Sequence, residues 1–494
     1  MKKLILRAFL LLLAILMVIP FAGCQETPTP QETDPVTDPA DTDFAESEPA
    51  AEEGPRLPET GYGGSEFLLL IRERSDYRED VYVDVLSEQS SSLQRAVYQR
   101  LSDVSQRLDV VFSAKTVDFS LESVAANVKV GTDVFDLVVD HGCCSITNAA
   151  NGYYYDWADL PYVDLEAEWW SDEARQEFTT PKGKLFAMLG DISYMSVGSA
   201  RCTFFNKALL QSVPSLTSPY ALVDADKWTF DVFEEYVMTL DSNMDGDGTG
   251  DLASDCFGYG TNWYRGPIQL FYSTGYRMLK WKNGEWRITA DNDTTSSAVF
   301  DMRELLFSEG VSILLKQDDY SALKEAFTES RVAFVDMLAH DAMDFAGSAI
   351  QYGILPSPKY NSRVKEYGSS VSSGTNLFGV MRNTTTENAE RISAVLEMMA
   401  YEGYTTVMPL YFDTVLSYQY LKDEDSVRML HLIHDNLILD FGGFYAEGIT
   451  TAIRDAIIEK DGSSLSRRID EIKESTLLLL QEWSSAGEKP LEEE

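Results

Sequence analysis

The order of apolar and polar positions predicts alternating strands and helices from about residue 64 onward. Residues 67–71 form an apolar run typical of a strand, and apolar residues then recur at helical spacing from Leu93 to Leu108. Two more apolar runs follow, at 110–112 and 134–139. Because strand, helix and strand succeed one another, we expect a parallel sheet covered by helices.

The C-terminal part of the chain has the same pattern. Residues 376–380 resemble a strand, and residues 384–387 can cap a helix whose apolar face carries Ala389, Ile392, Leu396 and Met399. The last predicted helix spans residues 465–483. We expect it to pack on the protein body through one stripe, formed by Leu465, Ile469, Ile472, Thr476, Leu479 and Trp483.

The N-terminus has the charged, apolar and small-residue order of an export signal. Lys2, Lys3 and Arg7 precede an apolar run at 8–19, which is shorter than the roughly 20 residues of a membrane span. Cleavage after residue 23 would leave Cys24 as the first mature residue and the site of a lipid anchor. We therefore expect a protein attached to the outer face of the cell membrane. Ordinary secretion with an incidental Cys24 stays the alternative.

The segment after the signal is acidic and rich in proline. Residues 25–55 contain ten acidic residues and six prolines but no lysine or arginine. Such a composition buries too little apolar surface to offset the entropy of ordering, so residues 24–64 are expected to be a disordered linker. About 430 residues follow, more than one hydrophobic core usually holds, which predicts two lobes.

The overall charge limits the classes of partner. The formal net charge is −40, from 80 acidic and 40 basic residues. This field repels nucleic-acid phosphates and anionic lipid headgroups, so it disfavours binding to either through charge and favours a neutral ligand. Four cysteines follow Cys24, too few for a disulfide-built scaffold of this length, although one disulfide stays open.

Several segments, taken in order, resemble one family of binding proteins. The segments are 93–111 (LQRAVYQRLSDVSQRLDVV), 135–140 (FDLVVD), 160–170 (LPYVDLEAEWW), 203–209 (TFFNKAL), 227–236 (KWTFDVFEEY), 331–335 (RVAFV), 352–356 (YGILP) and 372–380 (SSGTNLFGV). Together they are similar to the family 1 extracellular solute-binding proteins, which include the maltose- and oligosaccharide-binding receptors of ABC importers.

The resemblance implies an α/β protein with the type II periplasmic-binding-protein fold, in which crossing strands join two lobes around a cleft. The first lobe would comprise 65–197 and about 375–412, and the second about 201–370 and 414–494. The implied function is that of a monomeric receptor, without catalysis or a required cofactor, that delivers a neutral sugar to ABC permease subunits. A secreted glycoside-active enzyme and a surface carbohydrate-binding or adhesion protein are the alternatives, although the sequence has no GxSxG, HExxH or GxxxxGK[ST] motif.

Candidate ligand contacts lie on both expected lobes. Asp140 and His141 follow a buried-type strand, and ligands of open α/β sheets collect at the carboxyl ends of strands. The family's ligand segment on the second lobe resembles Asn262, Trp263, Tyr264 and Arg265, which combine stacking rings with hydroxyl-binding groups. Two aspartates complete the predicted set. These are Asp336, which lies where many family members have a glycine-rich turn with tryptophan, and Asp413.

One acidic loop has the composition of a calcium site. Carboxylate and amide oxygens alternate around glycines between residues 241 and 251, as a hard cation with six to eight oxygen ligands requires. The predicted ligands are Asn243, Asp245, Asp247, Asp251 and the carbonyl of Thr249. A solvated acidic turn without metal is the alternative. With either assignment the loop has a structural role.

Overall fold

The strands predicted near the N-terminal end of the folded part form one sheet. The computed structural model describes residues 54–131, 134–241, 250–308, 310–315, 320–412, 423–459 and 463–488. In the first sheet the strand order is β12-β3-β1-β2; β2 and β3 run parallel to β1, and β12 runs antiparallel to β3. The strands are β1 (Ser65–Arg72), β2 (Val110–Val117), β3 (Leu137–His141) and β12 (Asn376–Gly379).

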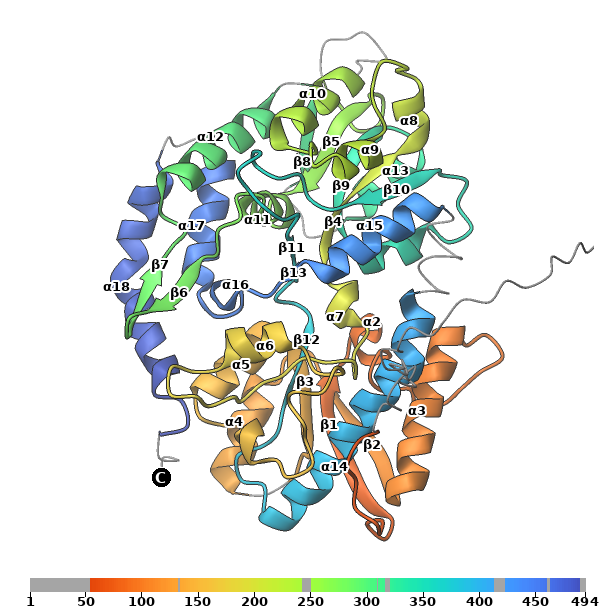
Figure 1. Cartoon of the computed structure of the whole chain (residues 1–494), viewed down its shortest axis with the longest axis vertical. Coiled ribbons are helices and arrows are strands. Elements are labelled where there is room, and N and C mark those ends of the chain that lie inside the picture. Colours follow the sequence, from red (N-terminus) through yellow and green to blue (C-terminus); the bar gives the residue numbers. More distant parts are fainter. Residues whose placement is uncertain are drawn as a thin grey trace, which may run out of the picture. The chain divides into compact units, whose positions relative to one another are not determined.

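Helices cover this sheet (Figure 1). The strongest start signal is at α3, where the Ser91 side chain accepts from the Gln94 backbone and Gln94 accepts from the Ser91 backbone, a capping box. The elements are α2 (Ser75–Arg78), α3 (Ser92–Leu108), α4 (Leu121–Val130), α5 (Gly142–Ala150), η1 (Trp157–Asp159), α6 (Asp172–Phe178), α7 (Met195–Gly198), α14 (Thr386–Glu402) and the π-helical turn η3 (Gly403–Val407).

A second sheet has the strand order β10-β4-β9-β5-β8. Its strands are β4 (Arg201–Asn206), β5 (Phe257–Asn262), β8 (Ser312–Leu315), β9 (Val332–Leu338) and β10 (Tyr352–Leu355). The helices that follow or cover them are α8 (Lys207–Gln211), α9 (Pro219–Asp224), α10 (Phe230–Leu240), α11 (Arg265–Tyr272), α12 (Asp293–Phe307), α13 (Ser321–Thr328), η2 (Ala339–Phe345) and α15 (Glu424–Asp435).

The chain passes between the two sheets several times. After α7 it enters the second sheet at β4, and it returns to the first sheet through β11 (Ser369–Ser370) before β12. It leaves again after α14, and β13 (Leu437–Ile438) then pairs in parallel with β11. Several crossing segments thus run side by side, as Figure 1 shows between the sheets. Such a set of crossings is suited to a hinge.

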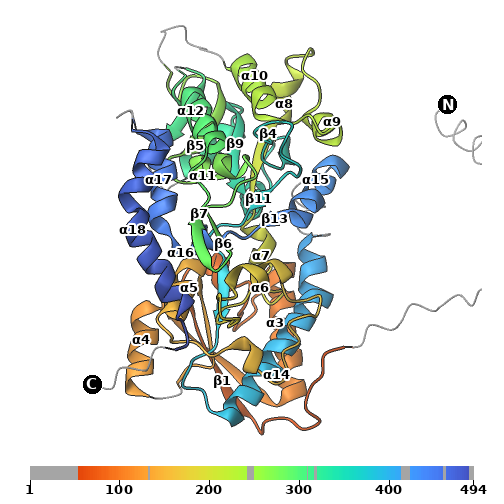
Figure 2. The same ribbon diagram turned by 60° about the vertical axis from the view of Figure 1, so that its left-hand side comes forward.

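The C-terminal helices contact elements around both sheets. The elements are the hairpin β6 (Leu279–Lys282) and β7 (Glu285–Ile288), with α16 (Phe441–Tyr445), α17 (Glu447–Ile458) and α18 (Leu465–Ser484). Helix α17 packs on α11 and α12, whereas α16 and α18 also touch α5 of the first sheet. Figure 2 shows α18 alongside α17 and reaching down toward α5. Beyond α18, Glu488 forms an ion pair with Lys182.

Most predicted elements are confirmed, with two corrections. Strand β3 begins at Leu137 rather than near residue 134, and the core stripe of α18 contains Leu480, which is fully buried, rather than Leu479, which is half-buried. Because a helix turns once per 3.6 residues, Leu480 lies four residues from Thr476 and three from Trp483, on the same face. The four cysteines after Cys24 are free thiols. The residue limits of the two lobes stay a prediction.

Candidate functional site

His141 stands at the carboxyl end of β3, at the edge where ligands of open α/β sheets collect. Its side chain is partly exposed, whereas the preceding Asp140 is fully buried. The Asp140 oxygens accept hydrogen bonds from the backbone N–H groups of Ser120 and His141, each at 2.7 Å. Although burial acts to raise it, these bonds and one with the His141 side chain hold the pKa of Asp140 below its usual range. Asp140 therefore positions His141, and its own contact with a ligand stays a prediction.

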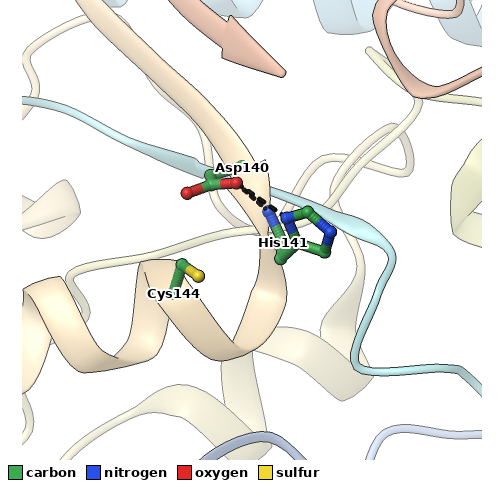
Figure 3. A group of neighbouring side chains, drawn as sticks. All are labelled: Asp140, His141 and Cys144. Atoms are coloured by element: carbon green, nitrogen blue, oxygen red, sulfur yellow. Dashed lines mark hydrogen bonds and ion pairs between the residues drawn. The ribbon is translucent and has the colours of Figure 1, made fainter. Parts of the chain in front are cut away.

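The hydrogen-bond partners of His141 determine which ring nitrogen carries the proton. Arg72 Nη2, at the end of β1, lies 2.7 Å from His141 Nε2. A guanidinium group can only donate, so Nε2 must accept. The proton is then on Nδ1, which donates to Asp140 Oδ1 at 3.0 Å (Figure 3). The ring is neutral and is held from both sides.

Asp140, His141 and Cys144 form the single group of potential metal ligands found within the described residues (Figure 3). Their ligand atoms lie within 4.8 Å of one another. A metal-binding histidine must present a ring nitrogen with a free lone pair. Since Nε2 accepts from Arg72 and Nδ1 carries the proton, this arrangement does not fit a metal.

Phe119, which sequence reasoning missed, adds an aromatic surface at the same edge. It follows β2, its exposed fraction is 58%, and its ring stacks on His141 with centroids 4.9 Å apart and planes 26° apart. An exposed ring fixed against a second ring offers a flat apolar face to a ligand. The predicted apolar run ended at residue 112, whereas β2 continues to Val117, so the position of Phe119 at a strand end could not be recognised from the sequence.

The predicted segment Asn262–Arg265 joins β5 to α11. Asn262 is buried, and its Oδ1 accepts from the backbone N–H groups of Tyr264 at 3.1 Å and Arg265 at 2.6 Å, so it helps to cap the helix. Trp263 is half-buried, and Arg454 Cζ lies 4.5 Å from its ring centroid. Its indole N–H is buried without a hydrogen-bond partner.

Arg265 is held by residues around the second sheet. Its Nη1 lies 3.0 Å from Asp341 Oδ2, and its guanidinium carbon lies 4.4 Å from the Tyr320 ring centroid. Asp341 also contacts Lys324 Nζ at 2.8 Å. Burial acts to lower the pKa of Arg265, but Asp341 and Tyr320 raise it overall. The charge of Arg265 is therefore matched within the protein.

Of the two remaining predicted contacts, the structure describes Asp336 but not Asp413. Asp336 is 1% exposed, accepts from Gln269 Nε2 at 2.9 Å and from the Tyr259 hydroxyl, and has its pKa raised to about 7 by burial. The structure thus places Asp336 in the interior beside β4 rather than at an open edge. Asp413 lies outside the described residues.

Only one of the predicted calcium ligands is described. Asp251 is exposed, and its two carboxylate oxygens accept from Ala253 N and Ser254 Oγ. The other four lie outside the described residues: Asn243, Asp245, Asp247 and Thr249. The calcium site therefore stays a prediction, as does the anchor at Cys24, which also lies outside them.

Side chains of the two sheets approach one another at these edges. Burial raises the pKa of Tyr264, Arg201 lowers it, Glu447 raises it, and a hydrogen bond with Ser373 lowers it. Ser373 belongs to the crossing segment that returns to β12, so Tyr264 touches the junction between the sheets. Cys143 N, just after β3, donates to Ser373 O at 3.3 Å. The structure thus brings the end of β3 and the start of α11 to the same crossing segment.

The fold matches solved structures, although no family model matches the sequence and no curated protein does. One match is an ABC substrate-binding protein from Listeria monocytogenes in complex with cycloalternan, with a TM-score of 0.54, 11% identity, and coverage of 84% of this chain and 98% of that one. Another is the GacH receptor of Streptomyces glaucescens, solved unliganded and with acarbose, with a TM-score of 0.54, 15% identity, and coverage of 85% and 99%.

A third match is a solute-binding protein of an ABC transporter from Agrobacterium radiobacter in complex with ribitol. Its TM-score is 0.55 at 13% identity, with coverage of 85% of this chain and 100% of that one. The chain has the fold of the ABC-transporter solute-binding proteins. At these identities the likeness establishes the fold alone.

The solute-binding-protein fold was the one that the sequence resemblance implied, so that expectation is confirmed. Within the described residues, no helix is both long enough and apolar enough to cross a membrane. A groove of about 740 Å³ lies beside β13 and α11, lined in part by Glu173, Tyr276 and Arg277. None of the predicted ligand contacts lines that groove.

Proposed function

We propose that this protein is an extracellular receptor that captures a sugar and delivers it to an ABC importer. The proposal is supported by the stacked rings of Phe119 and His141 at the ends of β2 and β3, and by Tyr264 after β5, which contacts Ser373, as does the segment after β3. Sugars present apolar C–H faces between hydroxyls, and a site of rings interleaved with hydrogen-bonding groups suits both. The matched structures include proteins solved with cycloalternan, acarbose and ribitol, which supports a sugar as the ligand.

Capture follows from the way in which the chain connects the sheets. A ligand that contacts both edges binds the closed arrangement more tightly than the open one, and this difference in affinity drives closure. The crossing segments around β11 and β13 are the elements that must bend. Closure then exposes a surface for permease subunits that the open form lacks.

The geometry favours binding over hydrolysis. A glycosidase needs two carboxyl groups at a defined separation, one of them free to donate a proton. Asp140 is buried and its pKa is lowered, so it is a poor proton donor. Asp336 already accepts hydrogen bonds from Gln269 and Tyr259. A secreted enzyme and a surface carbohydrate-binding protein without transport stay the competing functions.

A thermal-shift screen tests the proposal. A ligand that binds only the folded chain at 100 times its Kd adds about 2.7 kcal/mol to the free energy of unfolding. We expect at least one sugar or oligosaccharide in a broad panel to raise the melting temperature. Stabilisation by peptides or amino acids alone would keep a receptor but contradict the ligand class. No stabilisation by any sugar would contradict the proposed function.

Its finer parts have separate tests. Adjacent genes for two membrane permeases would support transport, and their absence would favour the adhesion alternative. We further propose that the mature protein is a monomer held at the outer face of the membrane by a lipid on Cys24. The basic, apolar and small-residue order of residues 1–23 supports the anchor.

A further inference from the structure

Arg201 lies where the chain first enters the second sheet. It is the first residue of β4, opposite Leu338 of β9, and its exposed fraction is only 4%. An arginine buried to this degree carries its charge into a poorly solvated environment. The cost of that burial is several kcal/mol unless the charge is paired and hydrogen-bonded.

The guanidinium group of Arg201 lacks such compensation. Its Nε and Nη1 atoms are buried and have no hydrogen-bond partner. Within the described part of the chain, no carboxylate oxygen lies within 4.0 Å of a guanidinium nitrogen of Arg201, so it forms no ion pair there. Asp336 is the buried carboxyl group whose pKa responds to Arg201, but burial raises that pKa to about 7, so near neutral pH Asp336 is only partly charged.

The buried Arg100 and the partly buried Arg391 show how a structural arginine is satisfied. Arg100 is 1% exposed, and it donates to the carbonyls of Ile192 at 2.6 Å, Val81 at 3.0 Å and Asp80 at 3.1 Å. Arg391 forms an ion pair with Asp136 at 2.6 Å. Arg201 has neither kind of partner, which distinguishes it from the arginines that hold this fold together.

Arg201 also lies beside the crossing segment that returns to β12, because Ala200 forms a β-bridge with Val371 and Ser372 N donates to Ser199 O at 3.0 Å. Burial lowers the pKa of Arg201, and the next largest influences are Tyr264, which raises it, and Arg265, which lowers it. Tyr264 is the residue that contacts Ser373 at the junction of the sheets. Because Asp341 neutralises Arg265, the uncompensated positive charge of this edge belongs to Arg201.

A second buried arginine without a carboxylate partner stands at the edge of the first sheet. Arg72 is 3% exposed, and its bonds go to neutral acceptors, the Gly374 carbonyl at 2.6 Å and His141 Nε2 at 2.7 Å. Its Nε is buried and unpaired. Arg72 is thus held by neutral acceptors at the edge of the first sheet, whereas Arg201 keeps two nitrogen atoms without a partner at the start of β4.

We infer that the ligand is a negatively charged sugar whose acid group binds the guanidinium of Arg201 between the two sheets. The inference rests on the proposed function. The planar guanidinium group of an arginine can donate two parallel hydrogen bonds to two oxygens of a carboxylate or sulfate. Such charge-assisted hydrogen bonds are about twice as strong as neutral ones. The chain's net charge favours a neutral ligand, but salt screens that field beyond about 8 Å, so the local charge decides.

Calorimetry with matched sugars tests the inference. Each set contains a neutral sugar, its uronate and its 6-sulfate, for example galactose, galacturonate and galactose 6-sulfate, as monomers and short oligomers. We expect the uronate or the sulfate to bind about 10- to 100-fold more tightly than its neutral counterpart, as expected for a hydrogen bond to a charged group. The preferred acid identifies which group Arg201 binds.

The outcomes separate the inference from the proposed function. Equal or tighter binding of the neutral sugars would overturn the inference and keep the sugar receptor. No binding by any sugar, charged or neutral, would overturn both.

Substitution of Arg201 distinguishes ligand binding from a structural role. In Arg201→Met, affinity for the acidic sugar should fall about 10- to 100-fold, while the melting temperature stays the same or rises, because an unpaired buried charge is removed. Arg201→Lys keeps the charge without the fork and should bind at an intermediate level. Arg287→Met, at an exposed arginine of the β6–β7 hairpin, is the control and should change neither quantity.

A loss of stability in Arg201→Met with unchanged affinity would show a structural arginine and would overturn the inference. If Arg201→Met does not fold, Arg201→Lys decides the matter. Affinity for the acidic sugar equal to that of the natural protein would then overturn the inference.

Discussion

Side chains at the edge of the first sheet hold one another in one orientation. Arg72 donates to His141, and His141 donates to the buried Asp140, so the imidazole ring can neither rotate nor change tautomer without breaking a hydrogen bond. Phe119 lies against that fixed ring. A rigid platform loses little entropy when a ligand stacks on it, so this edge is organised before binding.

The exposed ring of Phe119 should contribute directly to sugar affinity. Phe119→Ala removes a stacking surface that polar neighbours cannot replace, and we expect affinity to fall about tenfold with little change in melting temperature. Phe300→Ala is the matched control, because Phe300 is 61% exposed on α12, outside the candidate site. Calorimetry with the sugar found by screening compares the two variants. Equal affinities would remove Phe119 from the site.

The buried carboxyl of Glu397 should make stability depend on pH. Burial raises its pKa from 4.5 to about 7, although Trp170 Nε1 donates to it at 2.9 Å. Between about pH 4.5 and 7 the folded chain keeps a proton that the unfolded chain has lost, so the contribution of this group to stability falls as pH rises through that window.

Glu397→Gln removes this titration. The free energy of unfolding of the variant minus that of the natural protein should therefore be larger at pH 8 than at pH 5, by up to about 3 kcal/mol. Denaturant unfolding at the two pH values measures the difference, with Glu390→Gln, at an exposed position of the same helix, as the control. A stability difference between Glu397→Gln and the natural protein that is the same at both pH values would contradict the raised pKa of Glu397.

Sequence reasoning found some site residues and missed others for identifiable reasons. Asp140 and His141 follow a buried-type apolar run, so their position at a strand end was readable. Arg72 and Arg201 are also at strand ends, but nothing in the sequence shows that an arginine is buried or lacks a partner. That information depends on residues far away in the chain, such as Gly374 for Arg72.

The period of apolar residues was sufficient to predict those elements whose contacts are local. The spacing of apolar residues predicted α3, α14 and α18, because a helix buries the face that its own period creates. The partner of a strand is not local. Strand β12 pairs with β3 across more than 200 residues, and its antiparallel direction follows from the return of the chain from the second sheet.

The acidic loop at residues 243–251 should bind calcium and thereby stabilise the fold. A cation bound only by the folded chain raises stability by mass action, so a chelator should lower the melting temperature. Asp245→Ala, which removes one predicted ligand, should abolish that chelator effect. Asp293→Ala, in the first turn of α12, is a control that should preserve it. A melting temperature that does not respond to the chelator would leave a solvated acidic turn.

The N-terminal sequence predicts that the protein works at the outer face of the cell membrane. Cys24→Ala should release the protein from the membrane fraction into the medium, because the thioether-linked diacylglycerol provides two acyl chains, enough for stable attachment. Cys256→Ala, at a buried free thiol of the folded part, should leave the protein on the membrane. Fractionation of producing cells measures both. Membrane retention of the Cys24 variant would contradict the anchor.

We propose that the protein binds a sugar and leaves it unchanged. The most direct measurement is isothermal titration of the mature protein with the sugar that stabilises it most, followed by chromatography of the sugar recovered from the complex. We expect saturable binding that Phe119→Ala weakens, and a recovered sugar identical to the one added. Conversion of the sugar would instead show an enzyme, and an absence of binding would contradict the receptor.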